Sequence, residues 1–238
     1  MAAELPLERI LQSQGFGSRK ACRQLIRDGR VRVGEERVEN PFLELAVEGL
    51  DFEVDGQDWR YREKTYVMLH KPAGYECSRS PRHHPGVLSL LPPPLVQRGI
   101  QPVGRLDEDT TGLLLLSDDG DFIHRLISPR HKVPKVYAVT TKHSVRDELL
   151  EALRQGVLLH DAPEPVAALA CEGVSEHLLK LTLAEGRYHQ VKRMVAAAGN
   201  RVEALARVAI GGLVLPPDLP PGAWRWLEAD DLRRLQAL

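Results

Sequence analysis

Residues 104–121 read GRLDEDTTGLLLLSDDGD and place four consecutive leucines between two acidic groups. A short apolar run bounded by turn-forming residues is typical of a strand that is buried on both faces. The second acidic group, DDGD at 118–121, has the composition of a turn that leads into a helix, where carboxylates complement the helix dipole. The stretch therefore predicts a loop, a buried strand, a turn and a helix, in that order.

A calcium-binding loop is one alternative explanation of the acidic residues. Positions one, three, five, six and twelve of an EF-hand pattern fall on Asp107, Asp109, Thr111, Gly112 and Asp118. Position twelve should be a bidentate glutamate, and the leucines between these positions indicate a strand. Because the flanking segments are not two helices, the pattern disfavours calcium.

A pair of catalytic carboxylates, as in glycoside hydrolases, is the second alternative, with Asp107 beside Glu108 or Asp109. Neighbouring side chains in a loop point in different directions, so we expect one functional carboxylate among solvated ones. Arg105 stands two residues before Asp107, at the mouth of the strand. An arginine in this position can clamp the loop or contact a ligand.

The rest of the chain after residue 62 alternates between predicted strands and helices. Strands are expected over 66–70, 113–117, 135–141, 166–171 and 178–184, and further apolar segments cover 208–215 and 224–232. Helices are expected over 122–127, 144–156 and 189–199, the second with a capping box from Ser144 to Asp147. This pattern predicts an α+β domain at 63–238, with a mixed, largely antiparallel sheet and flanking helices.

Residues 1–62 are predicted to form a separate small α/β domain. Two short helices, the second capped by Ser18, a hairpin and a further strand are expected over 7–14, 19–29, 31–38 and 51–56. The polar residues 55–64 lack clear periodicity, so we expect a linker there.

The second helix of this domain is strongly basic. Its charged residues recur mostly at steps of three and four, so much of the positive charge shares one helical face: Arg19, Lys20, Arg23, Arg27 and Arg30. Such a face suits contacts with phosphates, although many charged helix faces are only solvated.

The composition limits the classes of protein that need to be considered. The 32 basic and 33 acidic residues nearly cancel, so affinity for a polyanion must come from clustered charge. The three cysteines are widely spaced, which argues against a disulfide framework and a zinc knuckle, and His83 and His84 lack further metal ligands. No secretion signal and no apolar run of membrane-spanning length is found, so we expect a cytoplasmic protein, a monomer without metal or membrane contact.

Two resemblances to known families follow from these motifs. The segment GFGSRKACRQLIRDGRVRVGEERV, residues 15–38, resembles the small RNA-binding domain named after ribosomal protein S4. Residues 104–120 resemble the catalytic motif of the pseudouridine synthase family that includes bacterial 16S ribosomal RNA enzymes. Three further motifs of that family occur in order, LHKPAGYECS at 69–78, SPRHKVPKVYAV at 128–139 and EGRYHQVKRMVAAAGNRV at 185–202.

The resemblance implies an isomerase that converts a specific uridine of ribosomal RNA to pseudouridine without a cofactor. Its motifs favour uridine 516 of 16S RNA as the target, in free RNA or in a small-subunit assembly intermediate. A 23S RNA pseudouridine synthase and a non-catalytic ribosome-assembly factor that binds RNA stay open as alternatives.

Three residues are implied as catalytic by the resemblance. Asp107 provides the carboxylate that acts at the ribose, either by attack on the anomeric carbon or by removal of the neighbouring proton. Lys192 keeps this carboxylate ionised, and Tyr137 stacks on the target uracil. RNA contacts are assigned to Arg105, Arg187, His189, Gln190 and Lys71 together with the basic helix.

Overall fold

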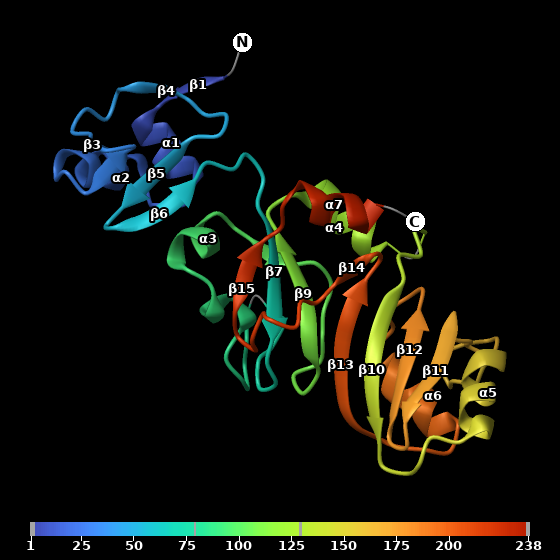
Figure 1. The fold of residues 1–238 in the computed structure, drawn as a ribbon. Helices are drawn as coiled ribbons and strands as arrows, with labels where there is room; N and C mark the ends of the chain where they lie inside the picture. Colours follow the sequence, from blue (N-terminus) through green and yellow to red (C-terminus); the bar gives the residue numbers. More distant parts are fainter. Residues whose placement is uncertain (1–2, 79, 129, 237–238) are drawn as a thin grey trace. The chain divides into compact units, whose positions relative to one another are not determined.

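The computed structural model describes residues 3–78, 80–128 and 130–236, and it forms two compact units (Figure 1). One unit comprises Met1–Thr65 and Leu91–Gln101, and the other comprises Tyr66–Leu90 and Pro102–Leu238. Within the described ranges, no helix combines the length and the apolar character needed to cross a membrane.

The segment Leu91–Gln101, expected in the second domain, belongs to the N-terminal unit. It contains the helix α3 (Pro93–Gln97), which begins with prolines at its first positions. Arg98 Nη1 donates hydrogen bonds of 2.8 Å to Gln14 Oε1 and to the carbonyl of Arg62. The N-terminal unit is therefore built from two separate stretches of sequence.

The N-terminal unit packs two helices against small sheets. The helices are α1 (Leu7–Ser13) and α2 (Arg19–Arg27), and Ser18 caps α2 as expected, because its side chain accepts from Ala21 N. The strands are β1 (Glu4–Pro6), which pairs with β4 (Glu44–Ala46), and a sheet in the order β3-β2-β5-β6 that comprises β2 (Val31–Val33), β3 (Glu36–Arg37), β5 (Asp51–Val54) and β6 (Gln57–Arg60). Buried apolar side chains of both helices and of β2 and β5 form its core.

The linker expected at 55–64 is wrong for its first half, because β6 pairs with β5 through a tight hairpin. Asp55 and Gly56 form the turn with φ values of 53° and 77°, the conformation that favours Asp-Gly in two-residue hairpins. Trp59 of β6 packs edge-on against Phe16 at 5.2 Å between ring centroids. The turn signal and the aromatic residue outweigh the polar composition of this segment.

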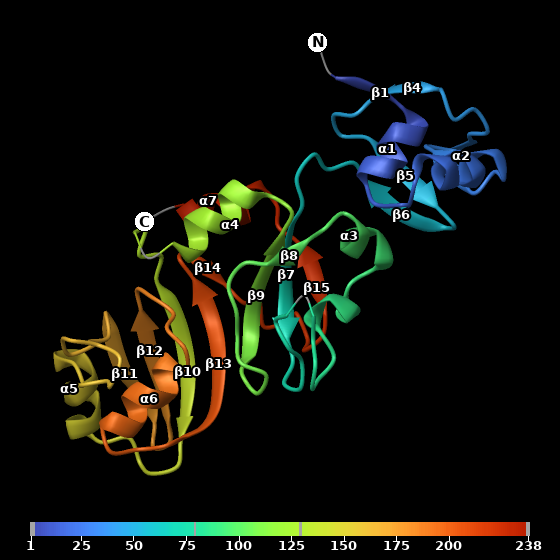
Figure 2. The ribbon, with the colours of Figure 1, turned by 180° about the vertical axis from the view of Figure 1, so that it is seen from behind.

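The C-terminal unit is built on a nine-stranded mixed sheet (Figures 1 and 2). Its strands are β7 (Tyr66–Lys71), β8 (Gln101–Pro102), β9 (Thr111–Ser117), β10 (Lys135–Thr141), β11 (Ala170–Ser175), β12 (Leu178–Leu183), β13 (Val202–Ile210), β14 (Leu213–Val214) and β15 (Trp224–Trp226). The main order is β11-β12-β10-β13-β9-β7-β15, while β14 and β8 pair with β13 and β9. Only the β9–β13 pair has a parallel register among the strand pairs of known register, which confirms a largely antiparallel α+β fold.

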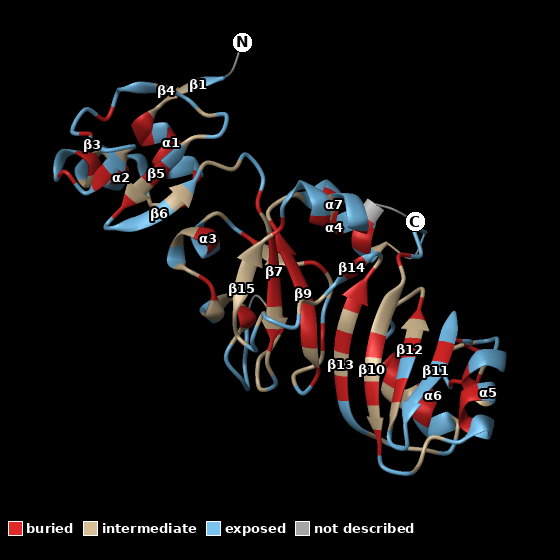
Figure 3. Cartoon of the chain, in the orientation of Figure 1, coloured by how far each residue is buried: buried red, intermediate tan, exposed pale blue. Residues whose placement is uncertain are grey.

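The four leucines of β9 are fully buried, as the apolar run predicts (Figure 3). Leu113 and Leu115 pack with side chains of two helices, α4 (Gly120–Ile127) and α7 (Ala229–Gln236). In a strand, alternate side chains point to opposite faces, so Leu114 and Leu116 face the other side of the sheet. β9 is therefore covered on both faces.

The second acidic group forms the expected turn and helix start. The Asp119 side chain caps α4 by accepting hydrogen bonds from Asp121 N at 3.1 Å and Phe122 N at 3.4 Å. It also accepts a hydrogen bond of 2.6 Å from the Tyr66 hydroxyl, which connects β7 to the same turn.

Asp231 connects α7 to β15. Arg225 of β15 donates two hydrogen bonds of 2.7 and 3.0 Å to the two oxygens of the Asp231 carboxylate. The Glu228 amide donates a third, of 3.0 Å. The hydrogen bonds from Arg225 hold the pKa of Asp231 below its usual range, although partial burial opposes this shift.

The remaining helices are α5 (Asp147–Gln155) and α6 (Gln190–Ala197), and a 3-10 turn covers Val87–Leu90. α6 lies behind the sheet in Figure 1 and in front of it in Figure 2. The predicted capping box at Ser144 is wrong, because α5 begins three residues later with Arg146 at its N-cap. The Ser144 hydroxyl instead donates to Glu176 Oε1 at 3.0 Å.

Candidate active site

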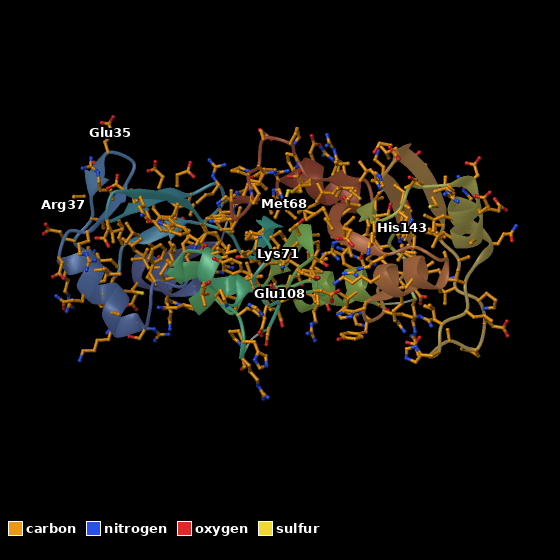
Figure 4. All side chains as sticks on the ribbon, turned by 90° about the horizontal axis from the view of Figure 1, so that it is seen from below. Glu35, Arg37, Met68, Lys71, Glu108 and His143 are labelled. Carbon is orange, nitrogen blue, oxygen red and sulfur yellow. The ribbon has the colours of Figure 1, made fainter. Side chains whose placement is uncertain are left out.

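Lys71 at the end of β7 binds the backbone of the loop between β8 and β9, which carries Asp107. Lys71 is 0% exposed, and its ammonium donates hydrogen bonds of 2.9 Å to the Glu108 carbonyl and 2.8 Å to the Thr110 carbonyl. Figure 4 shows Lys71 beside Glu108. A third hydrogen bond of 3.0 Å goes to the Pro72 carbonyl. The prediction that Lys71 contacts RNA is wrong, because its charge lies inside the protein and is bound to the backbone.

Lys71 has no carboxylate within ion-pair distance among the described residues. Burial lowers its pKa, while the negative charges of the surrounding loop partly oppose this shift. Two backbone carbonyls that follow Asp107 and one directly after β7 thus accept hydrogen bonds from one buried ammonium. These three charge-assisted hydrogen bonds tie the Asp107 loop to the end of β7.

Gly112 lets the start of β9 approach β13 closely. Its φ is +104°, and a Cβ at this position would lie 2.2 Å from the Arg207 carbonyl oxygen and 2.8 Å from the Arg207 amide nitrogen. Gly112 and Arg207 are direct partners in the parallel pair. The glycine is therefore required for the contact that brings the Asp107 loop next to β13.

Two basic groups from the start of α6 flank the Asp107 carboxylate. His189 Nε2 lies 3.4 Å from Asp107 Oδ1, and Lys192 Nζ lies 3.6 Å from Oδ2. The Asp107 side chain is 28% exposed, so it is reached from solvent at the edge of this group. The structure thus brings together Asp107, His189 and Lys192, all of which are predicted from the sequence.

Lys192 is shared with a second carboxylate. Its ammonium donates hydrogen bonds of 2.7 and 2.8 Å to the two oxygens of Asp109, shorter than its contact with Asp107. Partial burial would raise the pKa of Asp109, but the hydrogen bond and charge of Lys192 outweigh it, and the pKa falls below its usual range. Because the Asp109 side chain is 62% exposed, its pairing contributes little stability and can be exchanged.

A cavity of about 140 Å³ opens beside Asp107 and is named the Asp107 cavity below. Tyr137, which is 8% exposed on β10, and Leu205 of β13 line its sheet side. Arg105 lines the same cavity from the loop and forms no ion pair with the described residues, so nothing there supports a clamp function. The predicted catalytic aspartate and tyrosine therefore share one cavity.

The loop before α6 forms another wall. Gln190 is 3% exposed, and its amide oxygen accepts a hydrogen bond of 2.8 Å from Arg187 N. The Gln190 side chain thus orders this loop and lines the Asp107 cavity, and its contact with RNA stays a prediction. Arg187 remains exposed and pairs with Glu185 at 2.9 Å.

His189 adopts the left-handed conformation with φ of 49°, which directs the chain into α6. Non-glycine residues in this region are uncommon and tend to occur at functional sites. The exposed ring of Tyr188 stacks on His189 at 3.8 Å between centroids. Sequence reasoning missed Tyr188, although an aromatic residue inside a basic motif is a known signal of nucleic-acid stacking.

The basic helix α2 lies in the N-terminal unit and keeps only part of its predicted face. Arg19, Lys20 and Arg27 are exposed. Arg23 is bound to Glu8 through its guanidinium. Arg30 lies beyond the end of α2 and pairs with Asp55 at 2.6 Å, so it does not extend the helical face.

Two further basic residues of the Asp107 cavity were missed from the sequence, Arg207 of β13 and Lys135 of β10. Lys135 stands two residues before Tyr137, and strand alternation alone could have placed it on the same face. Arg207 was excluded because the predicted apolar segment began at residue 208, whereas β13 begins at Val202. Among the described residues, no three His, Cys, Asp or Glu side chains are grouped so as to hold a metal ion.

The sequence matches two family models. The model described as RNA pseudouridylate synthase matches residues 65–197, and the S4 domain model matches residues 5–45. The chain therefore belongs to the RNA pseudouridylate synthase family and is an RNA pseudouridine synthase with an N-terminal S4 domain. Both resemblances drawn from the motifs are confirmed.

Relatives of known name match almost the full length. The ribosomal small subunit pseudouridine synthase A of Escherichia coli (strain K12) is 40% identical over 227 residues, which cover 95% of this chain and 97% of the relative. An uncharacterized RNA pseudouridine synthase of Aquifex aeolicus (strain VF5) is 36% identical over 233 residues, 98% of this chain and 96% of that one. A crystal structure of a pseudouridylate synthase has 34% identity and a TM-score of 0.69, with 97% of this chain and 99% of that chain covered.

Proposed function

We propose that this synthase acts on small-subunit ribosomal RNA, at uridine 516 of 16S RNA, and that Asp107 is its catalytic carboxylate. The observation that carries the proposal is the convergence of Asp107, Tyr137 and the basic start of α6 on one cavity. The substrate assignment is supported by the names of the small-subunit relatives and by the four motifs in the chain.

The size of the Asp107 cavity fits a single pyrimidine ring. Its volume of about 140 Å³ is close to that of cavities that hold benzene, roughly 150 Å³. A base inside an RNA helix cannot reach such a cavity, so the target nucleotide must turn out of the stack. Tyr137 then stacks on the uracil, a contact of about 1–3 kcal/mol in comparable sites.

The reaction breaks the bond between ribose C1′ and uracil N1 and forms a bond between C1′ and uracil C5. The proton on C5 is lost and N1 gains one, so the reaction is a net isomerisation without oxidation. Asp107 acts at the ribose as an ionised carboxylate, either by attack on C1′ or by removal of the proton on C2′. The neighbouring His189 and Lys192 hold the carboxylate in position, with contacts of 3.4 and 3.6 Å to its two oxygens.

RNA affinity is assigned to surfaces outside this chemistry. Arg105, Arg187 and His189 line the cavity, and the exposed ring of Tyr188 stacks on His189. The exposed basic residues of α2 add phosphate contacts in the S4 domain. Ribosomal RNA as substrate places the reaction in the cytoplasm, and we expect a monomer.

The test is the substitution Asp107→Asn, which keeps the shape of the side chain and removes its charge. We expect turnover on unmodified 16S RNA fragments to fall by at least about 1,000-fold, while the Kd for RNA changes little. Glu108→Gln is the matched control, because Glu108 is the adjacent carboxylate and its contact with Lys71 is made by the backbone carbonyl, while its side chain has only a long contact of 4.0 Å with His84. It should retain activity.

Mapping of pseudouridine in 16S and 23S fragments separates the alternatives. Modification of 16S RNA at position 516 supports the full proposal, and modification of 23S RNA alone would replace the target. Binding of RNA without any pseudouridine formation by the unaltered protein would favour a non-catalytic assembly factor. Unchanged turnover of Asp107→Asn would reject Asp107 as the catalytic carboxylate.

A further inference from the structure

A buried arginine in the Asp107 cavity has an unused hydrogen-bond donor. Arg207 is 4% exposed, and its Nε donates a hydrogen bond of 2.9 Å to the Leu113 carbonyl. Its Nη2 is buried without a hydrogen-bond partner in the part of the chain that the structure describes. A buried guanidinium nitrogen without a hydrogen-bond partner lowers the stability of the folded protein. Its presence in the wall of a cavity therefore points to a ligand that accepts a hydrogen bond from it.

Lys135 lines the same cavity with a similarly weak set of contacts. Its Nζ has a contact of 3.4 Å with the Leu126 carbonyl. Lys135 and Tyr137 lie two residues apart on β10, and Tyr137 is the direct cross-strand partner of Arg207 on β13. By strand alternation the three side chains share one face of the sheet, the face that lines the cavity.

The two cations lack a carboxylate partner. Neither Arg207 nor Lys135 forms an ion pair within the described ranges, whereas Asp107 lies between His189 and Lys192. Burial, with a smaller contribution from the charge of Arg207, lowers the pKa of Lys135 to about 8. At neutral pH the cavity therefore carries positive charge on the wall formed by β10 and β13.

We propose that Arg207 and Lys135 contact the carbonyl oxygens of the target uracil and stabilise the negative charge that the base acquires when it leaves the ribose. This inference rests on the proposed function. When the C1′–N1 bond breaks, both electrons stay with the base, whichever route Asp107 takes. The charge spreads over N1 and the two carbonyl oxygens, and fixed donors in a water-excluded site stabilise such developing charge.

The charge remains on the base until it has turned and C5 has bonded to C1′. The C5 proton then leaves and N1 is protonated, so Arg207 and Lys135 need neither donate nor accept a proton. Their contribution is to bind the detached base as an anion, and it is distinct from the contribution of Asp107 at the ribose.

The experiment compares Lys135→Met with the unaltered protein on two RNA fragments in single-turnover reactions. One fragment carries uridine at the modified position, and the other carries 5-fluorouridine, whose fluorine makes the base a better leaving group. We expect Lys135→Met to slow cleavage of the glycosidic bond of uridine by about 100-fold, with the Kd for RNA within about threefold. With 5-fluorouridine the defect should shrink by about tenfold, because the base then needs less stabilisation.

Further variants separate charge stabilisation from packing. Lys135→Arg keeps the charge and should restore most of the rate, and Arg207→Met, which removes the charge, should show the same dependence on the fluorine as Lys135→Met. Lys180→Met is the matched control on the neighbouring strand, because Lys180 is about half exposed and pairs with Glu172. It should behave as the unaltered protein does.

The outcomes separate the role of Lys135 and Arg207 from the proposed function of the protein. A purely structural role of Lys135 would slow both fragments equally, and this result, or an unchanged rate, would overturn the inference while the proposed function stands. An unaltered protein that is inactive on both fragments and on all ribosomal RNA would overturn the proposed function, and the inference with it.

Discussion

The substitution Gly112→Ala tests how the fold positions the catalytic loop. The added Cβ would lie 2.2 Å from the Arg207 carbonyl oxygen, whereas real Cβ contacts are essentially never shorter than 3.0 Å. β9 and β13 must therefore separate by about 1 Å at their parallel contact. Because the loop of Asp107 runs directly into β9, this separation also moves Asp107 relative to Tyr137.

The expected cost has two parts. An alanine at φ of +104° costs roughly 1–2 kcal/mol, as other non-glycine residues in left-handed conformations do. Forcing extra volume into a close-packed contact adds about 1–3 kcal/mol. The sum of about 2–5 kcal/mol should lower the Tm of the C-terminal unit by roughly 5–15 °C. A displacement of about 1 Å at Asp107 should also reduce turnover on the order of 100-fold.

Thermal unfolding with single-turnover kinetics checks this expectation against two matched glycines of the same unit. Gly222 has φ of +84° but no atom within 4 Å of an added Cβ, so Gly222→Ala reports the backbone cost alone. Gly120 has open space and no positive φ, so Gly120→Ala should be close to neutral.

We expect Gly112→Ala to lose more in Tm and more in turnover than Gly222→Ala does. If Gly112→Ala unfolded at the same temperature as Gly222→Ala and kept full activity, the close approach of β9 and β13 would not be what positions Asp107.

Three other predictions concern charged residues. Lys71→Met should reduce the free energy of unfolding by about 2–4 kcal/mol and turnover by more than tenfold, because the Thr110 carbonyl loses its donor and the Glu108 carbonyl keeps only the Gly74 amide. Denaturant unfolding and single-turnover kinetics measure the two effects. Replacing Arg19, Lys20 and Arg27 together with Gln should reduce the slope of log affinity against log salt by up to about 0.9 for each phosphate that is no longer neutralised. Asp231→Asn should cost about 2–3 kcal/mol near neutral pH, with the difference from the unaltered protein vanishing in acid.

The sign of the last prediction follows from the depressed pKa of Asp231. A carboxyl group whose pKa is lower in the folded state adds stability above its unfolded pKa, near 3.8, and this stability is lost as the pH falls through the folded value. If the difference in the free energy of unfolding between Asp231→Asn and the unaltered protein stayed constant in acid, below the folded-state pKa of Asp231, the ion-pair explanation would be contradicted. For Lys71→Met, full activity would show that the loop does not need its ammonium.

The sequence predicted best where one local signal was enough. The apolar run of β9 identified a strand covered on both faces, and the acidic group after it identified the turn and the start of α4. Asp107, Tyr137 and Lys192 were found through motifs whose residue types suit the chemistry. Their roles stay predictions until the variants are measured.

The sequence failed where a side chain's surroundings came from distant strands. Nothing in LHKPAG shows that Lys71 is buried, because two of its three carbonyl partners lie almost forty residues further along the chain. The competition of Asp109 for Lys192 likewise depends on a contact between a loop and a helix 83 residues apart. Arg207 lies just before the predicted apolar segment at 208–215, and only the pairing of β13 shows that it lies in the sheet.

The assignment of Leu91–Gln101 to the N-terminal unit has a consequence for how such enzymes can be divided or recombined. The polypeptide crosses between the two units three times, so a single proteolytic cut cannot release either one as a free fragment. Removal of residues 1–60 would also take away most of the unit to which Leu91–Gln101 belongs. Leu95 and Ile100, each almost fully buried in the whole chain, would then lose that unit. Exchange of RNA-binding modules between relatives would therefore have to carry both stretches at once, as an interleaved pair rather than as a simple N-terminal appendage.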